Sequence, residues 1–299
     1  MKEILDLNSG SAATIFSFIK IPRDNPRDEL GIVELENSIS QAIWKMFDGI
    51  RGEISGRLGV DEADLLLADA RVIGIKIDGH QIINPSGFTG HELEILLAVT
   101  IVRRDKFVED KALFEGGSVR AYLIAKERGF GDALYVEVGD VSTTIFSIAP
   151  TGVSYARGFE WGMKNIVESI AKELGVMATT ASGIYDRHAG GRVSEHVMKR
   201  LDKIFYNAFA DFVSGVTLHV VGLAQNGKSK LPPIYLNTFF PIPEGLHRKR
   251  FTFGNKQVRF LPPAVETDVA QFADDEVHNI YDELNQLARR RIKWLMPAG

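Results

Sequence analysis

Near the middle of the chain the sequence reads Leu134-Tyr-Val-Glu-Val-Gly-Asp-Val-Ser-Thr-Thr-Ile-Phe-Ser147. Two apolar, β-rich runs flank Gly139-Asp140, which is a turn signal. The pattern predicts a β-hairpin with these two residues at its tip. Ser142 and Thr143 follow the tip, and small hydroxyl residues beside a tight turn can present N–H and O–H groups to a phosphate. The segment is therefore a candidate phosphate-binding hairpin.

Upstream of this hairpin, strand and helix signals alternate along the chain. Apolar residues recur at helical spacing in one segment, and β-branched or aromatic residues dominate several others. The predicted elements are a strand over 14–21, a helix over 33–54, strands over 72–77 and 93–102, a short helix over 109–114 and a strand over 119–125. The order begins strand, helix, strand, strand.

Downstream of the hairpin, helical signals predominate. The predicted elements are helices over 161–174 and 193–213, strands over 216–221 and 233–240, a basic hairpin over 247–260 and a final helix over 274–295. Gly175 is a stop signal for the first of these helices. The predicted domain boundary lies near Asp105-Lys106, which divides the chain into residues 1–105 and 106–299.

Composition narrows the class of protein. The chain has 299 residues, of which 45% are hydrophobic and 25% charged, values typical of a globular protein with a sizeable core. It has no cysteine, which excludes disulfides, thiolate metal sites and cysteine nucleophiles and fits a reducing compartment. No apolar run is long enough to span a membrane, and the first residues do not resemble a signal peptide. We expect a cytoplasmic α/β protein.

The hairpin resembles the second phosphate hairpin of the actin-like ATPases, Asp-x-Gly-Gly-Gly-Thr-Thr-Asp. Gly158-Phe-Glu-Trp-Gly-Met163 is similar to the stretch that follows it in the bacterial actin-like proteins FtsA and PilM. The segment 70–87, with its Asn84-Pro-Ser-Gly87 turn, resembles the strand–helix–strand–strand (SHS2) subdomain inserted in those proteins. The resemblance covers about residues 12–240. It implies an α/β, actin-like (ribonuclease H-like) core, with residues 1–105 as the SHS2-like insertion and its lead-in.

Several positions depart from the family hairpin. The departures are Glu137 for the first Asp, Asp140 and Val141 for two glycines, and Thr144 for the last Asp. Glycine lets a backbone approach phosphate closely, and a carboxylate at Asp140 repels a phosphate. Gly139, Asp140, Ser142 and Thr143 are thus predicted to form a degenerate cofactor site.

Two further elements of a nucleotide site are altered or missing. Phe239 and Phe240 occupy the place of a Gly-Gly turn on the adenine side. Asp6-Leu-Asn-Ser-Gly-Ser11 superficially resembles the family's first phosphate hairpin, Asp-x-Gly-Ser-Gly-Ser, but too little chain follows it to complete the first half of the core. We therefore expect no catalytic residues and no bound cofactor, with ATP and Mg²⁺ binding as the alternative.

The resemblance implies a scaffold that acts at the inner face of the cell membrane. Its partners would be a filament-forming protein in FtsA-like cell division or a PilM-like pilus-assembly protein, with self-association as a further expectation and no nucleic acid. Residues 12–105 would provide the contact surface. The strand that carries Phe16 and Phe18 could pair with a strand of a partner.

The C-terminal region offers a candidate membrane contact. An amphipathic helix is predicted there, with basic residues beside a tryptophan: Arg289, Arg290, Arg291, Lys293 and Trp294. It is similar in type to the membrane-binding C-terminal helix of FtsA relatives. The alternative is that the helix packs against the core.

Two rival functions use other phosphate sites. An ATP-binding, polymerising ATPase would use the 139–143 hairpin, with residues 6–11 as its first hairpin. A P-loop NTPase would use Gly222-Leu-Ala-Gln-Asn-Gly-Lys228-Ser229, although Pro232-Pro233 falls where the following helix should begin. Metal-binding and serine-hydrolase motifs are absent.

Overall fold

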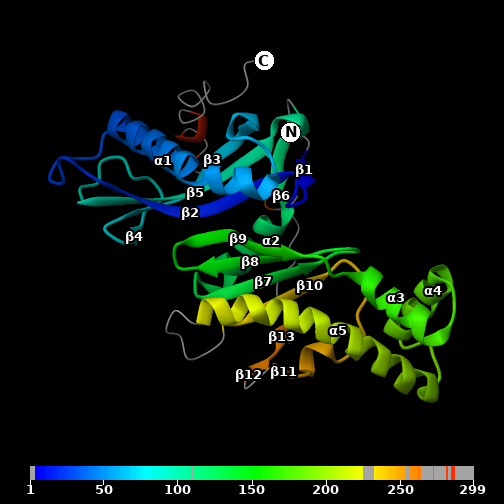
Figure 1. Ribbon diagram of the computed structural model, residues 1–299. Coiled ribbons are helices and arrows are strands. Elements are labelled where there is room, and N and C mark those ends of the chain that lie inside the picture. The colour runs from blue at the N-terminus through cyan, green and yellow to red at the C-terminus, as the bar shows by residue number, and fades with distance from the viewer. Residues whose placement is uncertain are drawn as a thin grey trace. The chain divides into compact units, whose positions relative to one another are not determined.

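The computed structural model describes residues 4–108, 111–224, 232–253, 256–263, 272, 281 and 284–286. The fold is mixed α/β and divides into two compact units, whose elements are labelled in Figure 1. Unit 1 comprises Met1–Gly131, Ile148–Tyr155 and Val265–Gly299, and unit 2 comprises Asp132–Ser147 and Ala156–Ala264. The predicted boundary near Asp105 lies inside unit 1.

Unit 1 contains the predicted order of strand, helix, strand, strand. These four elements are β2, α1, β3 and β5, with β1 before them and the short β4 between the last two. Its elements are β1 Ile4–Leu7, β2 Ala12–Pro22, α1 Ile32–Leu58, the 3-10 turn η1 Glu62–Asp64, β3 Leu65–Ile77, β4 His80–Gln81, β5 Glu92–Arg103, η2 Arg104–Lys106, β6 Ala112–Glu115 and α2 Gly116–Arg128. The assignment of this segment as an inserted SHS2 subdomain stays a prediction.

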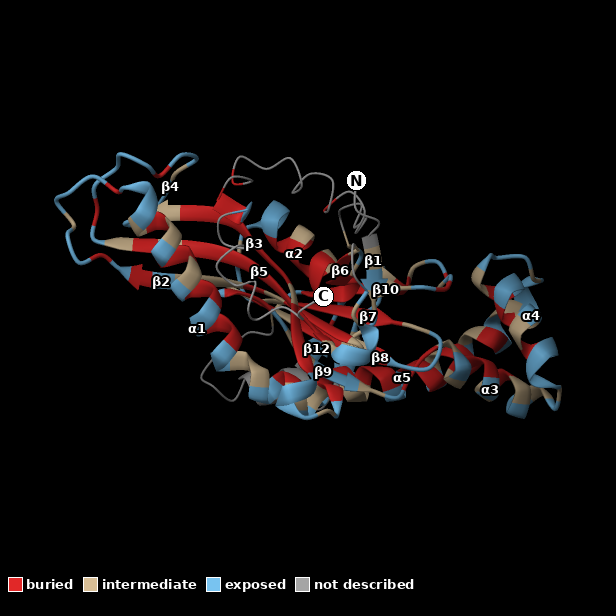
Figure 2. Cartoon of the chain, turned by 90° about the horizontal axis from the view of Figure 1, so that it is seen from above, coloured by how far each residue is buried: buried red, intermediate tan, exposed pale blue. Residues whose placement is uncertain are grey.

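The sheet of unit 1 is antiparallel and centred on β5. Strand β2 pairs with one side of β5 along its whole length, and β3 pairs with the other side. Helix α1 packs on this sheet through one apolar face, formed by Leu35, Ile39, Ile43, Met46 and Phe47. Figure 2 shows β3 and β5 as mostly buried. The helix ends at Gly59, whose positive φ of 66° suits glycine.

Two predicted elements of unit 1 are wrong. The short helix expected over 109–114 is instead strand β6 in its described part, because residues 112–115 pair in parallel with β1. The strand expected over 119–125 lies in helix α2, which begins at Gly116. A Cβ atom at Gly116 would overlap the Asp6 carboxylate. Both errors arise from contacts between segments about 100 residues apart.

Unit 2 contains the predicted hairpin. Its elements are β7 Ala133–Val138, most of β8 Thr143–Ala149, the second half of β9 Gly152–Phe159, α3 Met163–Leu174, α4 Ala178–Ala189, α5 Glu195–Ala224, β10 Ile234–Thr238, η3 Leu246–Arg248, β11 Phe251–Phe253, β12 Lys256–Val258 and β13 Phe260–Leu261. The end of β8 and the first half of β9 belong to unit 1. Its strands follow the order β13, β10, β7, β8, β9, and β10 is parallel to both β7 and β13. Helices α3 and α5 share one apolar core with these strands.

The strand predicted over 216–221 is wrong, because these residues continue helix α5. The run is β-branched and locally favours a strand. However, Phe209, Phe212, Val213 and Val216 recur at helical spacing and are all buried in the core of unit 2. Packing of this stripe overrides the local propensity. Helix α4 and strand β9 were not predicted.

Candidate functional site

The predicted phosphate hairpin exists. Strands β7 and β8 are neighbours, and the Gly139 N–H donates to the Ser142 carbonyl at 2.9 Å across the connection. Asp140, Val141 and Ser142 are exposed at the tip, whereas Thr143 is fully buried. The structure therefore brings the four predicted residues together on one turn.

The turn lies against the start of helix α3. The Met163 N–H donates to the Gly139 carbonyl at 3.1 Å, and the Lys164 N–H donates to the Asp140 carbonyl at 2.8 Å. The first N–H groups of a helix have no partner inside the helix and are the usual donors to a bound anion. Here the carbonyls of the hairpin accept these hydrogen bonds, so the two donors are not available to a phosphate.

Gly162 leaves no space between the helix and the turn. A Cβ atom at this position would overlap the Gly139 carbonyl oxygen and lie 2.6 Å from that of Asp140. The Thr143 hydroxyl donates to the Trp161 carbonyl at 2.8 Å and so points inward. Asn165 accepts a hydrogen bond from the Gly162 N–H at 2.9 Å. The sequence predicted the hairpin but not this closure, for which glycine at position 162 is the only local signal.

The neighbouring strand ends do not form a nucleotide pocket either. Glu137, in the place of the family's first Asp, is buried, and the Tyr135 hydroxyl donates to its carboxylate at 2.8 Å. Phe239 donates its N–H to the Val138 carbonyl at 3.1 Å and exposes 60% of its surface. Phe240 is buried beside the Tyr185 ring. Among the described residues, these side chains and backbone groups at the strand ends therefore bond to the protein itself.

The segment 6–11 forms a strand–turn–strand, as the rival ATPase requires, but its polar groups are engaged. The Asn8 side chain accepts the Gly10 N–H at 3.1 Å. Asp6 forms an ion pair with Arg120 at 3.1 Å. The Ser9 carbonyl accepts hydrogen bonds from Arg57 at 2.9 and 3.2 Å. These bonds hold the turn within unit 1.

Arg57 and Glu115 form a buried ion pair that the sequence analysis missed. Arg57 is 9% exposed and Glu115 is 1% exposed, measured on their side chains. Glu115 also accepts the Ser118 hydroxyl at 2.9 Å and the Thr14 N–H at 3.1 Å. Burial raises the pKa of the Glu115 carboxyl, and the Arg57 charge opposes that shift. Neither residue has a local sequence signal, because 58 positions separate them.

The P-loop alternative lacks its preceding strand. A P-loop joins a strand to the start of a helix. In this chain α5 continues through residue 224, so Gly222 lies on a helix rather than after a strand. Lys228 and Ser229 lie outside the described residues.

Phe16 cannot belong to an exposed partner surface. It is 1% exposed and stacks on the Tyr122 ring at a centroid distance of 4.3 Å. Strand β2 is not a free edge at this point, because Phe16 and Ser17 also pair with β9 residues of unit 1. Phe18 is partly buried, with its ring 5.4 Å from that of Phe130. Pairing with β9, which was not predicted, closes the proposed edge.

The predicted C-terminal membrane contact, residues 289–291, 293 and 294, lies outside the described residues. Two residues at the start of the predicted helix are in the core of unit 1, since Tyr281 and Leu284 are buried there. The Tyr281 hydroxyl donates to the Ile82 carbonyl at 3.0 Å. The Asn285 side chain accepts the Val72 N–H at 2.6 Å. This part of the segment packs against the core.

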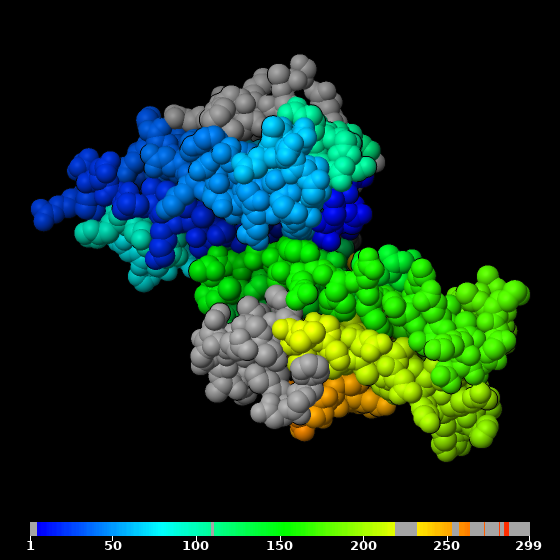
Figure 3. Space-filling model, viewed as in Figure 1, coloured from blue at the N-terminus to red at the C-terminus, as the bar shows by residue number. Residues whose placement is uncertain are grey.

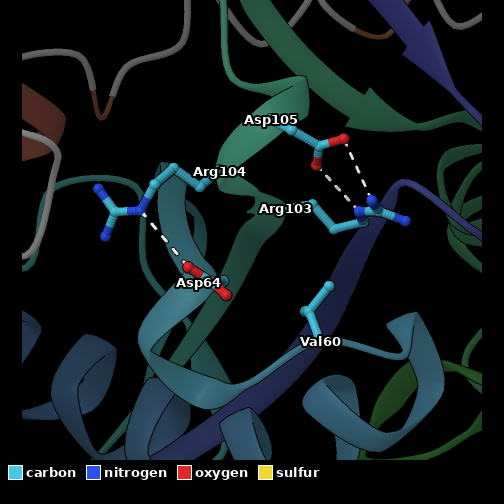
Figure 4. Close-up of a pocket in the computed structure, with 5 residues that line it drawn as sticks. All are labelled: Val60, Asp64, Arg103, Arg104 and Asp105. Carbon is cyan, nitrogen blue, oxygen red and sulfur yellow. Dashed lines mark hydrogen bonds and ion pairs between the residues drawn. The ribbon is translucent and has the colours of Figure 1, made fainter.

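Unit 1 also has an open cavity of about 490 Å³, lined by charged residues (Figure 4). Arg103 forms two hydrogen bonds with Asp105, at 2.9 and 3.1 Å. Arg104 lies 3.9 Å from Asp64. Both guanidinium groups thus face carboxylates. Their positive charges are balanced, so the residues that line the cavity carry no net positive charge that would attract an anion.

The described residues hold no group of three or more histidine, cysteine, aspartate or glutamate side chains that could bind a metal ion. A membrane-spanning helix is likewise not found in the part of the chain that the structure describes.

Comparisons with known proteins give matches in structure alone. No family model and no curated protein matches the sequence. The fold is similar to a structure of the PilM–PilN type IV pilus biogenesis complex, at 13% identity and a TM-score of 0.45, over 94% of this chain and 77% of the other. It is also similar to MreB5 of Spiroplasma citri bound to ADP, at 12% identity and a TM-score of 0.43, over 60% and 64%.

A third similar structure is the archaeal actin homologue Ta0583, at 13% identity and a TM-score of 0.31, over 74% of this chain and 75% of that one. At these identities the likeness concerns the fold and no shared site. The ligands and partners named for these structures belong to those proteins.

Proposed function

We propose that this chain is an actin-like scaffold that binds other proteins without using a nucleotide. The single observation that supports this function is the closure of the 139–143 hairpin onto α3, in which Met163 and Lys164 donate to hairpin carbonyls. Because these donors are taken up by the protein's own carbonyls, the start of α3 offers fewer groups to a phosphate. A scaffold needs only a stable surface.

The proposed setting is cytoplasmic, at the inner face of the cell membrane. The role would be FtsA-like in cell division or PilM-like in pilus assembly, and the sequence resemblance motivates both. The partners would then be a filament-forming division protein or a pilus-assembly protein, with self-association as a further property.

Thermal melting with and without Mg-ATP tests the absence of nucleotide binding. A ligand that binds only the folded state at 100 times its Kd stabilises that state by about 2.7 kcal/mol, which raises Tm by several degrees. We expect no shift at millimolar Mg-ATP. A shift would support an ATPase, and a Lys228→Ala variant that lost the shift would assign it to residues 222–229 instead of the hairpin.

The contact surface is proposed to lie on unit 1, where four large apolar side chains are exposed. They are Ile32 (53% exposed), Val33 (63%), Ile83 (67%) and Phe88 (47%). Ile32 and Val33 begin helix α1, and Ile83 and Phe88 lie in the loop after β4. Two backbone hydrogen bonds join these segments, from Leu30 N–H to the Phe88 carbonyl at 2.8 Å and from Gly87 N–H to the Leu30 carbonyl at 3.0 Å. Figure 2 shows exposed loops at the β4 end of this sheet. Exposed apolar patches of this kind mark protein contacts.

These loops are held in place by two charged side chains. Arg23 is buried and pairs with Glu34 at 2.7 Å, and it also donates to the Asp28 and Gly90 carbonyls. The Asp78 carboxylate accepts the His91 and Glu92 N–H groups at 2.9 Å, and these hydrogen bonds lower the pKa of Asp78. Both groups fix the backbone on which the apolar side chains sit, so the surface requires little ordering on binding.

Replacing Ile83 and Phe88 together with serine should weaken binding to the protein partner by at least about thirtyfold, since apolar anchors at an interface contribute about 2 kcal/mol or more. Binding is measured by interferometry against purified division and pilus-assembly proteins, and self-association by sedimentation. Phe239→Ser is the matched control, because that ring is equally exposed but belongs to unit 2. Unchanged affinity and self-association in the double variant would exclude this surface.

A further inference from the structure

One segment of unit 2 is strongly basic in a chain of net charge −4. Residues 245–263 contain five lysine or arginine residues and no aspartate or glutamate. The described part of this segment comprises η3, β11, β12 and β13. Interactions between exposed charges are screened beyond about 10 Å at moderate salt, so a local basic cluster acts on a partner whatever the charge of the whole chain.

The apolar side chains of this segment fix it on the protein. Leu246, Val258 and Phe260 are buried in the core of unit 2, and the Phe251 ring lies 5.2 Å from that of Phe209 on α5. Phe251 pairs with Val258 across the hairpin. In Figure 3 the segment, in orange, reaches the molecular surface beside α5. The hairpin is therefore anchored by one face.

The cationic side chains are on the surface. Arg248, Lys249, Arg250 and Arg259 are all exposed. Their contacts are to neutral groups: Arg259 donates to the His247 carbonyl at 3.0 Å, Arg250 to the Gln257 side chain at 3.4 Å, and Lys249 lies 3.3 Å above the Tyr206 ring. Among the described residues, none of these four cations has a carboxylate within ion-pair distance. Their charge is therefore exposed on the surface.

The arrangement favours a lipid surface over a nucleic acid. Proteins that bind single strands stack bases on exposed aromatic rings. Here the Phe251 ring packs inward and Lys249 covers the Tyr206 ring, so the described part of the hairpin offers no stacking platform. Two strands of three residues also span few successive phosphates. A plane of anionic headgroups accepts cations at any spacing.

We propose that η3 and the β11–β12 hairpin form a membrane-adhesion surface that contacts the headgroups of anionic phospholipids through Arg248, Lys249, Arg250 and Arg259. The attraction is electrostatic and falls with rising salt. This surface uses residues other than those of the 139–143 hairpin and of the predicted C-terminal contact. It would supply the proposed scaffold with a membrane contact, but it does not depend on whether the chain binds nucleotide.

Flotation of the full chain with lipid vesicles tests the proposal. Vesicles of phosphatidylcholine with phosphatidylserine should bind the protein at low salt, and vesicles of phosphatidylcholine alone should not. Each basic residue near an anionic surface changes partitioning about fivefold, so Arg248→Gln, Arg250→Gln and Arg259→Gln together should lower it by about a hundredfold. Melting curves check that the variant is folded.

The matched control is Lys172→Gln, Arg187→Gln and Arg200→Gln, which removes the same charge from exposed positions on α3, α4 and α5. Its binding should stay within about threefold of the original, since those positions lie on other elements. Equal losses in the two variants, or no loss in the hairpin variant, would overturn the proposal.

Two further experiments test the C-terminal segment as the membrane contact and RNA as the ligand. Arg289→Gln, Arg290→Gln and Arg291→Gln should leave most vesicle binding intact; abolition by this variant alone would assign the contact to the C-terminal segment and contradict the proposal. A labelled single-stranded RNA should not bind. RNA binding that the hairpin variant loses, with vesicle binding unchanged, would assign the surface to nucleic acid.

Discussion

Replacing Arg57 with methionine should lower the free energy of unfolding by about 3 to 5 kcal/mol at neutral pH. Removing one partner of a buried ion pair leaves the other charge without compensation in a medium of low dielectric. Methionine has a similar length and flexible shape, so the loss of charge dominates over a loss of packing. Glu115 would keep only the Ser118 hydroxyl and the Thr14 N–H as donors.

The pH dependence of this variant gives a second expected result. Burial already raises the pKa of Glu115, and without the Arg57 charge the pKa should rise further. A carboxyl whose pKa is raised on folding contributes stability in full below its unfolded pKa of about 4.3 and loses that contribution as the pH increases toward its folded pKa. The loss of unfolding free energy in the variant should therefore be smallest in acid and increase above about pH 4.

Urea unfolding at several pH values measures both effects. Arg51→Met is the matched control, because Arg51 pairs with Glu62 on the surface at 2.9 Å, with 43% and 48% of the two side chains exposed. An exposed pair contributes about 1 kcal/mol or less. If Arg57→Met were no more destabilising than Arg51→Met, the Arg57–Glu115 pair would not have the structural role assigned to it.

Substitution of Gly162 with alanine should destabilise the protein by about 2 to 4 kcal/mol. Its φ of −167° is ordinary extended backbone, so the cost is steric and not conformational. The added methyl would overlap the Gly139 carbonyl and separate the hairpin from α3. Overpacking typically costs about 1 to 3 kcal/mol, and each hydrogen bond lost at the helix start adds about 1 kcal/mol.

Gly183→Ala is the control for this prediction. Gly183 lies in α4 of the same unit and has open space where a Cβ atom would be placed. Alanine there should leave stability unchanged or raise it by up to about 1 kcal/mol. Equal stability of the Gly162 and Gly183 variants in urea would contradict the close contact between the hairpin and α3.

The sequence predicted elements whose signal is local. The periodic apolar residues of α1, the continuous apolar run of β5 and the Gly139-Asp140 turn each lie within one segment, and each prediction is confirmed. Elements defined by distant contacts were mistaken or missed. Strand β6 depends on β1, and the last turns of α5 depend on packing in the core of unit 2.

The candidate site shows the same division. Residue types identified the 139–143 turn and its departures from a phosphate hairpin. They could not indicate that Met163 and Lys164 would donate to the carbonyls of that turn, because backbone groups have no sequence signature. They also could not separate Phe16, which is buried under Tyr122, from a partner-facing strand. Such contacts depend on how segments pack.

The proposed scaffold, with its 139–143 hairpin bonded to the start of α3, should not bind nucleotide. Isothermal titration of the full chain with ATP and Mg²⁺ tests it most directly. We expect no saturable heat up to about 1 mM nucleotide, a concentration at which a Kd corresponds to a binding free energy of only about −4 kcal/mol. A saturable one-to-one isotherm with a Kd well below that concentration, retained in Lys228→Ala, would contradict it and show that the hairpin opens to bind nucleotide.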